Sequence, residues 1–98
     1  MEIEKQTNGL ILSVKPVGNI DTVTAVEFGE SVFDDLDEKI KLILDFSAVG
    51  YISSMGLRIL LELQKRMKEQ GEMVLQNVNE SVMEVFKISG FDKILTIV

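Results

Sequence analysis

The architecture of the chain can be read outward from one stretch, IKLILDFSAVGYISSMGLRILLELQKRMKEQG, which runs from Ile40 to Gly71. It opens with an apolar run from Ile40 to Phe46 that is interrupted only by Lys41 and Asp45. A short apolar run bounded by turn residues is typical of a strand that is buried on both faces. We therefore expect the central strand of a sheet here.

The second half of this stretch has the periodicity of a helix. After a turn of small residues, apolar side chains recur at spacings of three and four up to Gly71, which is a natural stop. Arg58, Glu62 and Arg66 fall on another side of the same helix, at i, i+4 spacing. The buried face is expected to contain Gly56, Leu60, Leu63 and Met67, widened by Leu57 and Leu61.

The residues before this stretch predict a hairpin. Residues 3–7 alternate weakly between apolar and polar, Asn8-Gly9 is a strong hairpin signal, and residues 10–17 read as a second strand. Pro16 cannot donate to a ladder and Gly18 follows soon after, so the second strand ends there.

A first helix is expected to follow and to run to about Asp35. Asp21, Thr22 and Thr24 all suit an N-cap, and Thr24 with Glu27 has the spacing of a capping box. Its apolar stripe is predicted from Val23, Val26, Val32 and Phe33.

The C-terminal third predicts a strand at 73–75, a helix capped by Asn77 or Asn79 and ended by Gly90, and a last strand at 94–98. The buried stripe of that helix is expected at Val82, Val85, Phe86 and Ser89. The element order β-β-α-β-α-β-α-β predicts an α/β fold with a mostly parallel sheet of about five strands, an N-terminal antiparallel hairpin and three main helices. A chain of 98 residues suits a single domain, residues 1–98.

Charge and composition exclude several classes of partner. A net charge of −6 disfavours nucleic acid, whose binding draws on clustered Lys and Arg, and it disfavours anionic lipid as well. No apolar run reaches the roughly 20 residues of a spanning helix. The N-terminus lacks the pattern of a signal peptide, so we expect a cytoplasmic protein with no membrane partner.

The chain has no Cys and no His, which removes thiol catalysis, imidazole acid-base chemistry and the usual zinc ligands. No Ser-Lys pair with a recognisable catalytic spacing is present, and no calcium-loop motif occurs among the sixteen carboxylates. We therefore expect neither an enzyme nor a resident metal or cofactor.

Ser53 and Ser54 lie where a strand gives way to a helix. Backbone N–H groups without intrahelical partners and the positive end of the helix dipole stabilise a phosphate at such a point. Phosphorylation there would add roughly −1.5 to −2 charges without melting the helix. The alternative from the spacing alone is structural: Ser53 caps the helix and Ser54 has no separate role.

The run Leu44-Asp45-Phe46-Ser47, followed by Tyr51-Ile52-Ser53-Ser54-Met55-Gly56-Leu57, resembles the signature of STAS domains, and specifically of bacterial anti-sigma factor antagonists. The resemblance extends over essentially the whole chain. It includes Gly18-Asn19-Ile20-Asp21 and Ser89-Gly90-Phe91-Asp92-Lys93-Ile94.

The resemblance implies that Ser54, two places before the glycine of the signature, is the phosphorylation site, with Ser53 as second choice. The chain departs from the family at two positions, since Ser53 replaces an Asp and Met55 replaces a small hydroxyl residue. The implied partner-binding residues are Asp21, Thr22, Ser53, Ser54, Met55, Gly56 and Arg58. Met55 is either an interface anchor or tucked under the helix, and Arg58 pairs with Glu62 or with a partner.

The implied mechanism is partner switching. The unphosphorylated protein would bind an anti-sigma factor that is also an ATP-dependent serine kinase, phosphorylation would end that interaction, and a PP2C-type phosphatase would restore it. An alternative from another functional class is a STAS scaffold that is never phosphorylated, or a ligand-sensing subunit of a larger complex.

Overall fold

The structure is a computed structural model that describes all residues from Met1 to Val98. It contains one five-stranded sheet in the order β1-β2-β3-β4-β5, three α-helices and one short 3₁₀ helix, η1. The elements are β1 (Glu2–Asn8), β2 (Ile11–Val17), α1 (Thr22–Phe33), β3 (Lys41–Asp45), α2 (Ser54–Gln70), β4 (Glu72–Gln76), α3 (Glu80–Ser89), η1 (Phe91–Lys93) and β5 (Thr96–Ile97).

The sheet has the predicted topology. Strand β1 pairs antiparallel with β2, while β2, β3, β4 and β5 pair parallel in sequence order, with β3 at the centre. The predicted α/β class, the N-terminal hairpin and the three helices are therefore confirmed. The last strand is shorter than the predicted 94–98, because the N–H groups of Ile94 and Leu95 both donate to the carbonyl of Phe91 in the turn that ends η1.

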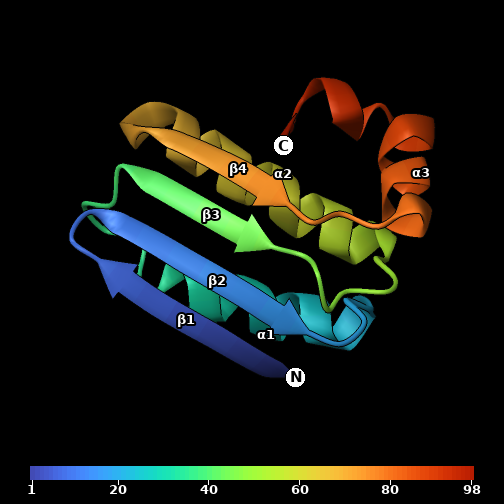
Figure 1. The fold of residues 1–98 in the computed structure, drawn as a ribbon, viewed down its shortest axis with the longest axis horizontal. Coiled ribbons are helices and arrows are strands. Elements are labelled where there is room, and N and C mark those ends of the chain that lie inside the picture. Colours follow the sequence, from blue (N-terminus) through green and yellow to red (C-terminus); the bar gives the residue numbers. More distant parts are fainter.

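The helices cover only one face of the sheet (Figure 1). Helices α1 and α2 lie side by side behind the strands, and α3 packs at one end. The inward residues Leu42 and Leu44 of β3 are fully buried, but Lys41, Ile43 and Asp45 are only half-buried. The prediction that this strand is buried on both faces is therefore wrong, because no helix lies over the outer face.

The hairpin turn lies one residue later than predicted. Asn8 still pairs with Ile11, so the two loop residues are Gly9 and Leu10. Gly9 has φ of +62°, a left-handed conformation that glycine adopts without steric cost.

Helix α1 differs from its prediction in its cap and in its buried face. Asp21 is the N-cap and forms the capping box with Thr24, so the predicted Thr24–Glu27 box is wrong. The predicted stripe is also wrong in part, because Val23 is 77% exposed and Val26 is 44% exposed. The buried face consists of Ala25, Phe28, Gly29 and Val32.

Helix α2 buries the face that its periodicity predicts. The stripe predicted for α3 is wrong in part, because Val85 is only half-buried and Ser89, in the last turn, is exposed. The buried residues of α2 are Gly56, Leu60, Leu63 and Met67, and those of α3 are Val82 and Phe86. Asn79 is the N-cap of α3, and its side chain accepts the N–H of Val82 at 2.8 Å. These faces pack on the inner side of the sheet in one core of 20 buried apolar residues.

Candidate functional site

The carboxyl ends of β2 and β3 meet at the same edge of the sheet, where α1 and α2 begin (Figure 1). Beyond the strands, Ile20 and Ile52 form an isolated parallel bridge. The Ile20 N–H donates to the carbonyl of Tyr51 at 2.9 Å, and the Ser53 N–H donates to the carbonyl of Ile20 at 2.8 Å. The two loops that precede α1 and α2 are thereby held together.

Gly56 allows α2 to pack closely against this bridge. A Cβ atom at Gly56 would lie 2.5 Å from Ile52 Cγ1 and 2.9 Å from Ile20 Cγ2, which is closer than van der Waals contact permits. Gly56 is itself buried. The close approach of α2 to the loops that contain Ile20 and Ile52 thus explains why the motif has a glycine here.

The two serines at the start of α2 have different environments. Ser53 is the N-cap, only 8% exposed, and its Oγ accepts the N–H of Gly56 at 3.2 Å. Ser54 is the first residue of the helix and is exposed. The capping role expected for Ser53 is confirmed, and the hydroxyl of Ser54 is left for another role.

Met55 and Arg58 border Ser54 on α2. Met55 is half-buried and packs against the core, so it lies partly under the helix. Arg58 is exposed, and its Nε lies 3.6 Å from Glu62 Oε1. Of the two roles predicted for Arg58, the structure contains the ion pair within the helix.

Asp21 directly follows Ile20, and Ser54 lies two residues after Ile52. The bridge between Ile20 and Ile52 therefore brings Asp21 and Ser54 to the same edge of the sheet. The Oδ1 atom of Asp21 accepts the N–H groups of Val23 and Thr24 at 2.9 and 2.8 Å. These bonds, above all those from the backbone and hydroxyl of Thr24, lower the pKa of Asp21. Asp21 and its neighbour Thr22, the first residue of α1, are both exposed.

Removing the Asp21 side chain is expected to lower stability in a pH-dependent way. Because the pKa of Asp21 is lowered in the folded protein, its carboxylate stabilises the fold above the ordinary value of 3.8, and this stabilisation is lost as the pH falls through the folded pKa. The urea midpoint of Asp21→Ala should therefore lie below that of wild type at neutral pH, and the gap should narrow in acid. Asp21→Asn, which retains a capping side chain, is the control. A gap that is independent of pH would contradict this role.

The sequence did not single out Ile20 and Tyr51 as parts of this site. Ile20 is fully buried, and its N–H and carbonyl groups make the two hydrogen bonds of the bridge. Tyr51, whose carbonyl accepts one of these bonds, is 52% exposed. The two family motifs, residues 18–21 and 51–57, contain both residues, but a single bridge between distant loops leaves no periodic signal in a sequence.

Of the predicted partner-binding residues, Ser53 and Gly56 are buried and the others are exposed or half-buried. The residues of this list that are not buried, which we call the serine patch, are Asp21, Thr22, Ser54, Met55 and Arg58. No group of three or more His, Cys, Asp or Glu side chains is placed to hold a metal ion. None of the helices is both long and apolar enough to cross a bilayer.

Known proteins resemble this chain in sequence and in fold. BtrV, a candidate anti-sigma factor antagonist of Bordetella bronchiseptica, is 46% identical over 52 residues, which are 52% of this chain but only 45% of BtrV. The anti-sigma-B factor antagonist of Listeria monocytogenes is 29% identical over 96 residues, covering 96% of this chain and 82% of that protein.

Among solved structures, the anti-sigma factor antagonist SpoIIAA in its unphosphorylated form superposes with a TM-score of 0.84 at 15% identity, covering 99% of this chain and 88% of that chain. The superposition therefore includes nearly the whole chain. The family model of the STAS domain matches residues 2–98. The chain therefore belongs to the STAS domain family.

Proposed function

We propose that this protein is an anti-sigma factor antagonist that binds an anti-sigma factor with serine kinase activity and is switched off by phosphorylation of Ser54. The observation that carries the proposal is the exposed position of Ser54 at the first residue of α2, with the capping role already filled by Ser53. A kinase can reach the Ser54 hydroxyl without breaking a helix cap. The names of the BtrV and Listeria relatives support the antagonist role.

The surroundings of Ser54 would accept a phosphate without loss of the fold. The N–H groups at the start of a helix have no acceptor four residues back, so those of Ser54 and Met55 face the added oxygens. A phosphate here would also gain from the positive end of the dipole of the 17-residue helix α2.

The same phosphate would oppose partner binding. It would add roughly −1.5 to −2 charges beside the carboxylate of Asp21, on a chain whose net charge is already −6. A dianion in a closed interface loses its hydration and repels nearby carboxylates. The serine patch would therefore bind its partner in the unmodified form and release it in the modified form.

The proposed cycle needs two other proteins, the kinase that is also the anti-sigma factor and a PP2C-type phosphatase that removes the phosphate. ATP and magnesium belong to the kinase, so the chain itself would be a cytoplasmic regulatory module and not an enzyme. The alternative function is an unmodified scaffold or a ligand-sensing subunit, in which Ser54 carries no phosphate.

The test is phosphorylation of the purified chain by the kinase of its own cells, with ATP, read by intact mass and by phosphopeptide sequencing. We expect one phosphate per chain, located on Ser54, and none in Ser54→Ala. Ser53→Ala is the control, because that variant loses the cap and keeps the acceptor. Uptake of phosphate by Ser54→Ala would contradict the role of Ser54 as the acceptor, and no uptake by wild type would favour the unmodified scaffold.

A further inference from the structure

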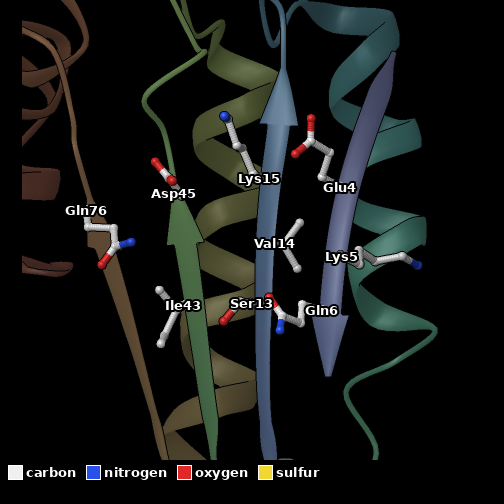
Figure 2. Close-up of a pocket in the computed structure, with 9 residues that line it drawn as sticks. All are labelled: Glu4, Lys5, Gln6, Ser13, Val14, Lys15, Ile43, Asp45 and Gln76. Carbon is white, nitrogen blue, oxygen red and sulfur yellow. The ribbon is translucent and has the colours of Figure 1, made fainter. Parts of the chain in front are cut away.

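The outer face of the sheet, which no helix covers, contains a hollow of about 350 Å³ (Figure 2). It is open to solvent and lies across β1 to β4, on the face of the sheet opposite α1 and α2. Its polar lining comes from Glu4, Gln6, Ser13, Lys15, Asp45 and Gln76, and Ile43 supplies an apolar part of the floor.

The register of the sheet brings these residues together. Glu4 lies opposite Lys15, and Gln6 lies opposite Ser13, which in turn neighbours Ile43 on β3. Alternate residues of a strand point to the same face, so these side chains all project outward on the side away from α1 and α2 (Figure 2). On the other side of β3, Asp45 is paired with Gln76 of β4.

Apart from Asp45, the polar side chains named above make no hydrogen bond or ion pair within the chain. Lys15 forms none of the five ion pairs of the structure, although Lys5 and Lys41 on neighbouring strands each form one. The side chains of Gln6, Ser13 and Gln76 make no hydrogen bond to any other group of the chain. Four side chains able to donate hydrogen bonds thus converge on one cavity.

The carboxylate of Asp45 is held in place at the rim. Its Oδ1 accepts the N–H of Ser47 at 2.9 Å and Nδ2 of Asn77 at 3.0 Å. Burial by itself would raise the pKa of Asp45, but these hydrogen bonds and the charge of Lys15 outweigh it and lower the pKa. Asp45 is therefore a fixed negative charge, and Lys15 is the positive charge next to it.

We propose that this hollow binds a small zwitterion of the amino-acid type. Lys15 and Ser13 of β2, with the amide of Gln6 on the neighbouring β1, face the ligand's carboxylate, while Asp45 of β3, on the other side of Lys15, faces its ammonium group. A ligand with a single charge would be attracted by one of these charged side chains and repelled by the other. A volume of about 350 Å³ is at the small end of the range for ligand cavities, which suits a molecule of this size.

The site would give the chain a second input that does not depend on the phosphorylation of Ser54. Asp45 is the last residue of β3, and the segment after it leads to Ser53 and α2. The proposal requires only binding at the outer face, so it can be right or wrong independently of the proposed function.

The experiment is a titration of the ¹⁵N-labelled full chain with each of the common L-amino acids, followed by amide shifts in NMR spectra. We expect at least one amino acid to give saturable shifts at Gln6, Ser13, Lys15 and Ile43, with a Kd of about 1 mM or tighter when titrated to about 10 mM. Lys15→Met, which keeps the length of the side chain and removes its charge, should weaken this binding about tenfold or more.

Two further variants make the result specific. Asp45→Asn removes the negative charge that faces the ammonium group, keeps an oxygen for the hydrogen bonds of Ser47 and Asn77, and should also weaken binding. Lys65→Met, on the exposed side of α2, should not. The proposal is overturned if no amino acid gives saturable shifts, if the shifts lie outside the hollow, or if Lys15→Met binds as wild type does.

Discussion

Ser54→Asp is expected to weaken binding of the partner kinase by roughly 5- to 150-fold, the range of coupling found between two linked sites in proteins. The substitution places a carboxylate beside Asp21 on the exposed edge where we propose that the partner docks. Aspartate carries one charge where phosphate carries nearly two, so the loss should be smaller than that caused by phosphorylation itself. Ser54→Ala should bind at least as tightly as wild type. The measurement is calorimetric or interferometric affinity for the purified kinase.

A matched control is present in the chain. Ser81 is an exposed serine near the start of α3, so Ser81→Asp places the same charge at a comparable helix position outside the serine patch. It should leave the affinity unchanged. Equal losses for Ser54→Asp and Ser81→Asp would mean that net charge, and not the position of Ser54, governs binding.

Stability separates switching from unfolding in this series. A carboxylate in the first turn of α2 is favourable by about 0.3 to 1 kcal/mol, so Ser54→Asp should not lower the urea midpoint. Ser53→Ala should lower the free energy of unfolding by about 1 kcal/mol, because Ser53 holds the cap. Ser54→Ala removes no cap and should change it little.

Gly71→Ala is expected to be the most destabilising of the single-methyl substitutions in this fold. Gly71 joins α2 to β4, and a Cβ atom there would overlap the backbone carbonyl of Ile40. That carbonyl accepts the N–H of Glu72 at 3.0 Å, just where β4 begins its pairing with β3. Backbone cannot rotate away as a side chain can, so we expect a loss of about 3 kcal/mol, the upper end of the usual cost of overpacking.

The comparison for this prediction is Gly50→Ala. A Cβ atom at Gly50 would lie 3.3 Å from Asn19 Oδ1, the end of a side chain that can move. Its effect should therefore stay within about 0.5 kcal/mol, the range in which most surface changes fall. Both variants are measured by urea unfolding, and the slope m should equal that of wild type. Similar midpoints for the two would contradict the close approach at Gly71.

The helices show which sequence patterns carry three-dimensional information. Helix α2 was predicted correctly because its buried residues recur at alternating spacings of four and three along one face. Helix α1 was predicted less well because its apolar residues lie on more than one face. Gly29, which looks like a weak point in a helix, is buried, and a Cβ atom there would lie 3.0 Å from Ile59 Cδ1. Contact between α1 and α2 outweighs helix propensity at this position.

The outer face of the sheet shows the opposite case. An apolar strand flanked by helices suggests cover on both faces, and only the placement of all the helices on one side shows that this is wrong. The alternation of Lys41, Ile43 and Asp45 with Leu42 and Leu44 was visible in the sequence. Ile43 obscured it, because an apolar residue in the outward series made the run nearly continuous.

The candidate site was predictable as a motif but not as a geometry. The position of Ser54 at the start of α2 followed from the small-residue turn and the helix periodicity. The division of roles between Ser53 and Ser54 required the cap hydrogen bond, and the proximity of Asp21 required the bridge between Ile20 and Ile52. Contacts between segments more than thirty residues apart depend on the whole topology, and one sequence does not encode them locally.

The bridge between Ile20 and Ile52 has a kinetic consequence. Its backbone bonds order both loops before any partner arrives, so binding loses little conformational entropy in these segments. Association should then resemble the docking of two rigid surfaces, without a slow folding step. Under these conditions variants of one interface differ mainly in the rate of dissociation. The residence time of the complex, and not the speed of encounter, is therefore the quantity that a charge on Ser54 would control.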